Sequence, residues 1–211
     1  MKILLISDEE SKSLWEYYKP GALAGIDMIL SAGDLRAEYL SFLVTMSNRP
    51  LLYVCGNHDN HYQKIPPEGC DCVEDRLVTV KGLRILGLGG TKLYGSFNCK
   101  TEREMEHRIN KLKGKIRKAG GVDIVLAHAP VRGIGDSDDI AHRGYEVFSD
   151  LIMKYHPKYF VHGHVHQSYT GAGFNRIRTV GDTQVINAFE KYVLELDDNC
   201  CKEIEKQFKA E

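Results

Sequence analysis

Five short apolar runs along the chain each lead into a polar residue that can bind a metal ion. The runs cover residues 2–7, 27–33, 51–56, 123–127 and 158–163. Short apolar runs with polar boundaries are typical of strands that are buried on both faces of a sheet. The pattern therefore predicts an α/β protein with several interior strands.

The residues that follow these runs carry two carboxylates, one amide and four imidazoles. They are Asp8, Asp34, Asn57, His58, His128, His164 and His166. In open α/β sheets, binding and reacting groups collect just beyond the carboxyl ends of the strands. We therefore expect all of these side chains to meet at the same edge of one sheet.

Helical and hairpin patterns occupy the segments between and after the apolar runs. Helices are predicted over residues 11–20, about 36–47, 101–119 and 144–156, a hairpin over 76–80 and 83–87, and short strands over 167–172, 177–180, 184–187 and 192–196. The helix over 101–119 has the clearest ends, because Thr101 is a favourable N-cap and Gly120-Gly121 stops it. Strands interleaved with helices and followed by further strands indicate two stacked sheets with helices outside.

The 211 residues show no repeat, low-complexity tract or linker. We therefore expect one domain over residues 1–211, with the charged tail 197–211 at its periphery as a short helix or a frayed end. A hydrophobic content of 43% is enough for a substantial core. With a net formal charge of −1, the chain as a whole does not attract nucleic acid or an anionic membrane. A local basic patch is still compatible with this net charge.

Targeting and redox signals are also weak in this sequence. No apolar run approaches the roughly 18–20 residues of a membrane-spanning helix, and we interpret residues 1–8 as a first strand rather than a signal peptide. The six cysteines, at positions 55, 70, 72, 99, 200 and 201, do not follow zinc-knuckle spacing. A chain with its own core needs no disulfides, so we expect reduced cysteines and a cytoplasmic location.

Two local motifs concentrate the candidate chemistry. Gly56-Asn57-His58-Asp59 places an amide, an imidazole and a carboxylate in succession, and Gly163-His164-Val165-His166 places two imidazoles two residues apart. Gly163 would let the backbone turn sharply at the end of its strand. Asp34 follows Gly33 and can bridge two cations through its two carboxylate oxygens.

Together these motifs resemble those of the calcineurin-like metallophosphoesterase family. The family order is Asp-x-His, Gly-Asp, Gly-Asn-His-Asp/Glu, His and Gly-His-x-His, and this chain matches four of the five between Asp8 and His166. The resemblance implies a four-layer α/β/β/α sandwich, in which helices flank two mixed β-sheets. It also implies a centre of two divalent metal ions.

The resemblance assigns the metal ligands by position. One ion would be bound by Asp8, Asp34 and His166, and the other by Asp34, Asn57, His128 and His164. Asp34 would therefore bridge the two ions. The implied reaction is in-line attack of a metal-bridging hydroxide on phosphorus, with no covalent phosphoenzyme. His58 would stabilise the transition state or protonate the leaving group, and Asp59 would orient His58.

The first motif departs from the family pattern. Ser7-Asp8-Glu9-Glu10 has Glu10 where the family usually has histidine. If Glu10 binds the first ion, the additional hard oxygen favours Mn²⁺ or Mg²⁺ over metals that prefer nitrogen ligands. We therefore expect Mn²⁺ to be the native metal, with Mg²⁺, Fe, Ni²⁺ and Zn²⁺ as the alternatives. The sequence does not decide whether Glu10 binds a metal ion.

A long loop begins at His128 and runs to Gly144. Arg143 or Arg132 could hold a phosphate, and His142 could reach the metal ions. The alternative is that the acidic cluster of this loop is simply solvated and that His142 caps the next helix. Gly87-Leu88-Gly89-Gly90-Thr91-Lys92 lacks the third glycine of a dinucleotide fingerprint, so tight packing or a close approach to the site is its expected role.

The expected function is phosphoesterase activity on a small phosphorylated substrate, with phosphodiesters slightly favoured over monoesters. A non-catalytic binding scaffold with the same fold is an alternative, which Glu10 mildly favours and His58 opposes. A metal-dependent nuclease is a further alternative, but the near-neutral charge makes nucleic acid an unfavourable partner. The substrate, the native metals and the oligomeric state stay open.

Overall fold

The computed structural model describes residues 1–92, 97–137, 139–166 and 174–196, and most of its strands belong to two large sheets. The first sheet contains, in spatial order, β13 (Glu190–Glu195), β1 (Lys2–Ser7), β2 (Met28–Ser31), β3 (Leu51–Tyr53) and β4 (Asp71–Cys72). The second contains β11 (Ile177–Val180), β12 (Thr183–Asn187), β10 (Tyr159–His162), β9 (Ile124–Ala127), β6 (Leu83–Leu88) and β5 (Arg76–Val80). A small sheet pairs β7 (Thr91–Lys92) with β8 (Cys99–Lys100).

Both large sheets are mixed. In the first, β1 to β4 run parallel and β13 is antiparallel to β1. In the second, β6, β9, β10 and β12 run parallel, and the edge strands β5 and β11 are antiparallel to their neighbours. All five apolar runs of the sequence become strands within the parallel parts of these sheets. Their carboxyl ends therefore open toward a shared end of each sheet.

The first sheet packs on both of its faces. Ile3 and Leu5 enter the core between the two sheets, whereas Leu4 and Ile6 lie in the cluster that packs under α1 (Ala37–Ser47). This alternation follows from the two-residue period of a strand. It explains why the sequence of β1 is continuously apolar rather than alternating.

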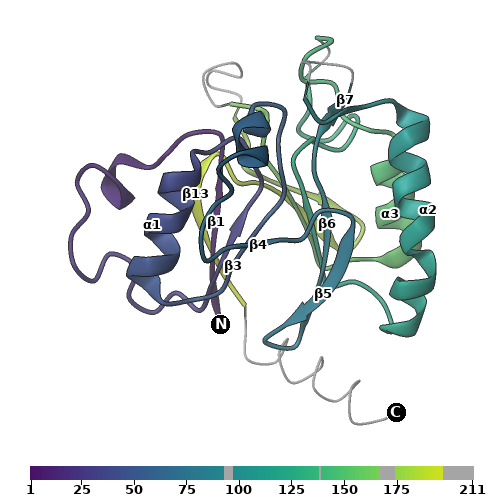
Figure 1. Ribbon diagram of the computed structural model, residues 1–211. Helices are drawn as coiled ribbons and strands as arrows, with labels where there is room; N and C mark the ends of the chain where they lie inside the picture. Colours follow the sequence, from purple (N-terminus) through teal and green to yellow (C-terminus); the bar gives the residue numbers. More distant parts are fainter. Residues whose placement is uncertain (93–96, 138, 167–173, 197–211) are drawn as a thin grey trace.

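The second sheet repeats this arrangement on the opposite flank. Ile124 and Leu126 of β9 face the inter-sheet core, and Val125 packs in the cluster of α2 (Glu102–Lys118) and α3 (Val147–Tyr155). Figure 1 shows α1 on one side of the strands, with α2 and α3 on the other. The four-layer α/β/β/α sandwich that the resemblance implied is confirmed.

The predicted helices agree with the structure to different degrees. The helix over 101–119 forms as α2, with Thr101 and Glu104 in a reciprocal capping box, and the helix near 36–47 forms as α1. The helix expected over 11–20 is wrong, because only the 3₁₀ helix η1 (Lys12–Leu14) forms, followed by turns. An isolated helix of ten residues is only marginally stable. In the structure, the segment is held by side-chain packing, because Trp15 and Tyr18 lie edge-on against Phe42 of α1.

The helix expected to begin at Gly144 begins three residues later, at Val147. Tyr145 accounts for the delay, because its N–H donates to Pro130 O at 3.2 Å and its carbonyl accepts from Arg132 N at 3.1 Å. The hairpin predicted around Lys81-Gly82 is confirmed as β5 and β6. The strand predicted over 167–172 and the tail 197–211 lie outside the described residues.

The glycine-rich segment after β6 packs tightly, as expected. A Cβ atom at Gly89 would lie 2.5 Å from the carbonyl oxygen of Cys55, and Gly90 N donates to that same oxygen at 2.8 Å. The segment therefore joins the second sheet to the end of β3.

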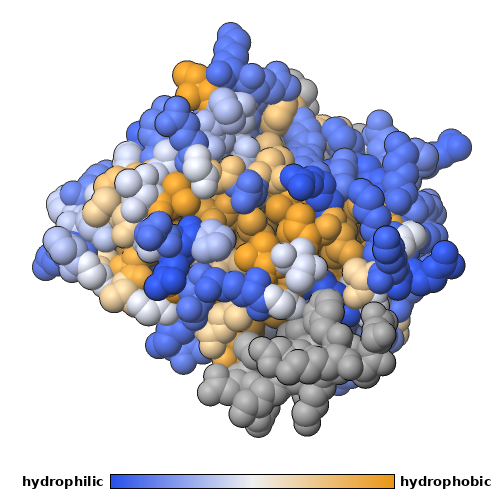
Figure 2. Space-filling view, turned by 60° about the horizontal axis from the view of Figure 1, so that its bottom comes forward, coloured by the Kyte–Doolittle hydropathy of each residue, from blue (hydrophilic) through white to orange (hydrophobic). Residues whose placement is uncertain are grey.

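The end of the sandwich near the N-terminus has an apolar surface. Figure 2 shows hydrophobic residues gathered there in a band between hydrophilic flanks. Partly buried Met1, Val78, Val80, Ile177 and Tyr192 pack against the inter-sheet core. Among the helices described, none combines the length and apolar character that crossing a bilayer requires.

Candidate metal centre

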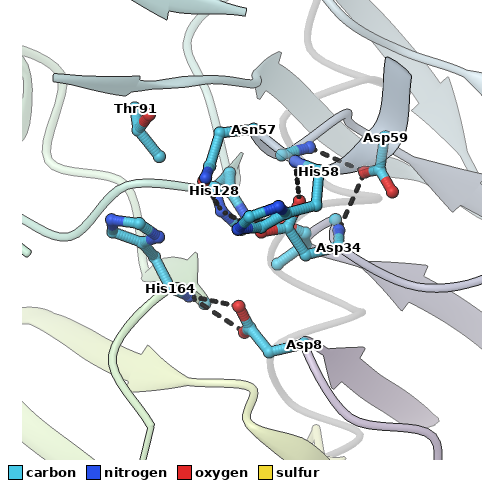
Figure 3. A network of polar contacts seen from close by, with 12 residues as sticks. Asp8, Asp34, Asn57, His58, Asp59, Thr91, His128 and His164 are labelled. Carbon is cyan, nitrogen blue, oxygen red and sulfur yellow. Dashed lines mark hydrogen bonds and ion pairs between the residues drawn. The ribbon is translucent and has the colours of Figure 1, made fainter. Parts of the chain in front are cut away.

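The candidate site lies where strands of both sheets end. Asp8 and Asp34 follow β1 and β2 of the first sheet, whereas His128 and His164 follow β9 and β10 of the second. The expectation of a site at the edge of one sheet is therefore wrong. Packing the sheets face to face brings the carboxylates of one sheet to the imidazoles of the other (Figure 3).

Four side chains form a compact donor cluster. One potential ligand atom from each of Asp8, Asp34, His128 and His164 lies within 4.8 Å of all the others. His128 is fully buried, and His164 is 6% exposed. Asn57 is 5% exposed, and its Oδ1 lies 3.3 Å from His128 Nε2, which places the amide beside the cluster.

His128 is oriented by the backbone at the end of the neighbouring sheet. Its Nδ1 lies 2.7 Å from Ala32 O, so the proton belongs on Nδ1 in the neutral ring. Its Nε2 is then left for the site, where it lies 3.3 Å from Asp34 Oδ2. A carbonyl that fixes the tautomer in this way is a common support for a metal-binding histidine.

His164 is held in a comparable way. Its Nε2 lies 2.7 Å from Ala141 O, which places the proton on Nε2 and leaves Nδ1 able to bind a cation. Its backbone N–H donates to Asp8 Oδ2 at 2.9 Å. This contact links the carboxyl end of β10 to the carboxyl end of β1, across the two sheets.

The backbone at the site adopts unusual conformations. Asp8, Asp34 and His164 have φ angles of 65°, 58° and 67°, in the left-handed region that residues with side chains seldom adopt. The expectation that Gly163 makes the sharp turn is wrong, because His164 itself carries the positive φ. Gly163 is required for space instead, since a Cβ there would lie 2.5 Å from Asp8 Oδ2.

The electrostatics of the cluster favour a positive charge between the carboxylates. Burial alone would raise the pKa of Asp34, but the His128 charge and hydrogen bonds outweigh it and lower the pKa to about 2. Burial alone would lower the pKa of His128, yet Asp34, Asp8 and the Ala32 carbonyl raise it to about 10. Two carboxylates that stabilise a buried cation provide the electrostatic condition that a divalent metal ion needs.

His166 lies beside the cluster and is more exposed than its four members. His166 Nε2 is 3.4 Å from Asp8 Oδ1, and the His166 side chain is 32% exposed. Glu10 is not part of the compact cluster. Its Oε1 accepts hydrogen bonds from Arg36 Nε at 2.9 Å and from Arg36 N at 3.2 Å. Its role as a metal ligand stays a prediction.

His58 and Asp59 differ in their burial and in their contacts. The His58 residue is exposed, and its N–H donates to Asp34 Oδ1 at 2.8 Å. Asp59 is buried, and its Oδ2 accepts from the N–H groups of Asp34 and Gly56, each at 2.8 Å. Asp59 therefore holds the backbone of the two ligand segments, and the expected contact between Asp59 and the His58 ring is not among the hydrogen bonds of the described residues. Burial, followed by the Asp34 charge, raises the pKa of Asp59 to about 6.

The loop after His128 contributes one imidazole to the rim of the site. The His142 ring lies 5.1 Å from the His164 ring, and its Nδ1 is 2.9 Å from Asp139 Oδ1. Arg143 is exposed, and Arg132 pairs with Asp136 at 2.9 Å. The structure thus brings His142 next to the candidate ligand His164. Arg132, in contrast, forms an ion pair with Asp136 inside the loop.

Comparison with known families decides the relationship. A family model described as calcineurin-like phosphoesterase matches residues 1–168. The chain belongs to the calcineurin-like phosphoesterase family. This family is metal-dependent, and the cluster of Asp8, Asp34, His128 and His164 is the candidate metal site of this member.

Individual relatives agree with this assignment. The UPF0046 protein C25E10.12 of Caenorhabditis elegans is 29% identical over 233 aligned positions, covering 89% of this chain and 74% of that protein. The crystal structure of TT1561 of Thermus thermophilus superposes with a TM-score of 0.62 at 17% identity, covering 90% of this chain and 89% of that one. A further crystal structure reaches a TM-score of 0.66 at 15% identity over 92% and 94% of the two chains. At these identities, the two structures are evidence for the fold alone.

The donor set fits a divalent ion on chemical grounds. Carboxylate and amide oxygens combined with imidazole nitrogens suit first-row divalent metals. Sequence reasoning identified these donors, but it missed the carbonyls of Ala32 and Ala141 that orient the two histidines. No sequence signal could have found them, because every residue carries a carbonyl.

Proposed function

We propose that this protein is a phosphoesterase that uses two divalent metal ions to hydrolyse a small phosphorylated substrate. The observation that carries the proposal is the buried cluster in which Asp8 and Asp34 from one sheet meet His128 and His164 from the other. Two buried carboxylates whose oxygens lie within 4.8 Å of two oriented imidazoles are stabilised by a bound cation. Buried charges in proteins are usually paired or bound to a metal ion.

The proposed ligand sets share Asp34. We name Asp34, Asn57, His128 and His164 the inner half-site, and Asp8, Glu10 and His166 the outer half-site, with Asp34 common to both. When bound, divalent ions would neutralise charge on phosphoryl oxygens and lower the pKa of a water molecule. Mn²⁺ is our first expectation for this mixture of hard oxygen and imidazole donors.

The surrounding residues would position the substrate and move a proton. His58 is anchored through its N–H on Asp34 Oδ1, so its exposed imidazole stays beside the cluster and can protonate a leaving oxygen. His142, next to His164, is the candidate substrate contact of the loop, with Arg143 as a second. We propose phosphodiesters over monoesters as substrates, as the sequence led us to expect.

The proposed setting is the cytoplasm. Cys55, Cys70 and Cys72 form no disulfide within the described part of the chain. Reduced cysteines of this kind are typical of proteins in reducing compartments.

Hydrolysis of bis-p-nitrophenyl phosphate and p-nitrophenyl phosphate with added Mn²⁺ tests the proposal. The wild-type protein should turn over both compounds, and the diester should have the higher kcat/KM. His58→Gln should lower kcat by roughly 10²- to 10⁴-fold, the usual contribution of a general acid, while the bound Mn²⁺ stays unchanged.

His107→Gln is the matched control, because His107 is an exposed residue of α2, in the helical layer that covers the second sheet. This variant should behave as the wild type. A fully metallated protein without turnover, and with no effect of His58→Gln, would contradict the enzymatic proposal.

The pairing of Glu10 with Arg36 favours a second candidate function. If Glu10 is committed to Arg36, the outer half-site has fewer ligands than the family pattern provides. A protein with a depleted half-site could use the fold as a binding scaffold. The same hydrolysis experiment separates the two functions, since a scaffold binds Mn²⁺ without turnover.

A further inference from the structure

A second group of metal-binding side chains lies behind the inner half-site. Cys55 follows β3 and directly precedes Gly56-Asn57, whereas Cys72 ends β4 and Glu74 follows it. The strands β3 and β4 are parallel neighbours with Tyr53 opposite Cys72. One donor atom from each of Cys55, Cys72 and Glu74 lies within 4.8 Å of the other two.

The two sulfur atoms lie close enough to share one ion, since their separation is no more than 4.8 Å. A metal ion binds the thiolate form of cysteine, so an ion between these two sulfur atoms would favour the loss of their protons. Both cysteines are only half-buried, which leaves a path for an ion from solvent.

Glu74 is held firmly but keeps one acceptor position. Its Oε1 accepts from Arg108 Nη2 at 3.1 Å and from Asn98 Nδ2 at 3.0 Å, and its Oε2 accepts from Cys55 N at 3.3 Å. An ionised carboxylate has about four lone-pair positions, and three are occupied here. The fourth, on Oε2, is available on the oxygen that already lies against Cys55.

We propose that Cys55, Cys72 and Glu74 form a separate site for one thiophilic divalent ion of the zinc group, such as Zn²⁺ or Cd²⁺. Two sulfur donors and one oxygen suit these ions, and they suit Mn²⁺ and Mg²⁺ poorly. With three protein ligands, water completes a tetrahedral site. The ion would tie the end of β3 to the segment after β4 and so brace the backbone that leads to Asn57.

Titration of the full-length protein with Cd²⁺ tests this site, because cadmium bound to thiolate has an ultraviolet charge-transfer band that carboxylate and imidazole ligands do not produce. A Cys200→Ser/Cys201→Ser background removes the adjacent C-terminal pair of thiols. In that background we expect the band to saturate at one Cd²⁺ per chain. Cys72→Ser and Cys55→Ser should each weaken the Cd²⁺ affinity measured from this band by more than about tenfold, because losing even a residue that only supports a ligand costs about 10- to 100-fold.

Two controls separate this site from other sources of the signal. Cys70→Ser removes a half-buried thiol two residues from Cys72 and should leave the band unchanged. Asp34→Ala should also leave the band intact, so failure of the phosphoesterase proposal would not affect this result. Glu74→Gln keeps both thiols and should weaken the affinity without abolishing the band at saturation.

The outcome that overturns the proposal is equally direct. A background protein without a charge-transfer band, or a band that Cys72→Ser and Cys55→Ser leave unchanged, would show that the two thiols are a packing pair only. Circular dichroism of each variant confirms that a lost band reflects lost ligands in a folded chain.

Discussion

His128 and His166 are both imidazoles proposed to bind a metal ion, but the protein treats them differently. His128 is fully buried, with Nδ1 on the Ala32 carbonyl and Nε2 facing Asp34 and Asn57. The side chain of His166 is 32% exposed and lies 3.4 Å from Asp8. The inner half-site is thus largely assembled in advance, whereas the outer half-site has a partly solvated histidine and a Glu10 that is paired with Arg36.

Because of this difference, the two metal positions should bind their ions with unequal affinity. Preformed ligands lose little conformational entropy on binding, and a dry environment strengthens their attraction for a cation. An exposed imidazole and a glutamate that must leave an arginine both weaken binding at the outer position. We therefore expect the inner half-site to fill first as the metal concentration rises.

The largest effect is expected from the residue that the half-sites share. Asp34→Ala should remove metal from both positions and reduce hydrolysis to background, because the substitution deletes the bridging carboxylate. Metal analysis after dialysis against Mn²⁺ measures this directly. Asp71→Ala, an exposed change on β4, is the control and should keep the wild-type metal content. Loss of only one ion from Asp34→Ala would show that Asp34 does not bridge.

A paired substitution compares the half-sites themselves. His128→Ala should weaken binding of the first Mn²⁺ more than His166→Ala does, because it also leaves the Ala32 carbonyl and the buried carboxylates without their partner. His166→Ala should affect only the second ion. Isothermal titration of the metal-free proteins with Mn²⁺ gives both affinities. Equal losses in the two variants would contradict the difference between the half-sites.

The smallest effect is expected from Glu10. The Glu10–Arg36 pair is partly exposed, and such pairs contribute about 0.2–1 kcal/mol to stability, so Glu10→Gln should change the thermal midpoint little. If the pairing with Arg36 persists in solution, the second Mn²⁺ should bind Glu10→Gln with an affinity within about tenfold of the wild type. A much larger loss would identify Glu10 as a ligand. Arg36→Ala then serves as the complementary variant, since it frees Glu10 and should tighten the second site.

The sequence predicted much of this architecture, for identifiable reasons. The apolar runs mark β1, β2, β3, β9 and β10 because strands buried on both faces are made mostly of apolar side chains. The capping box of α2 is readable because Thr101 and Glu104 stand three residues apart. Both patterns are local, so they can be recognised without knowledge of the tertiary structure.

The features that the sequence could not reveal depend on distant contacts. Glu10 meets Arg36 across 26 positions, and His128 meets the Ala32 carbonyl across 96. The assignment of the ligands to two sheets also depends on how the sheets stack, which no local pattern encodes. Asp59 is a further case, because its position beside His58 suggested an imidazole contact while the fold turns its carboxylate toward backbone N–H groups.

The left-handed backbone at Asp8, Asp34 and His164 has an evolutionary consequence. Such conformations cost on the order of 1–3 kcal/mol each for residues other than glycine, so the fold tolerates these side chains at the expense of its own stability. Glycine at any of the three positions would relieve the strain and erase a ligand in one step. Stability alone would therefore favour glycine at these positions, and a requirement for the side chains as ligands would oppose that substitution.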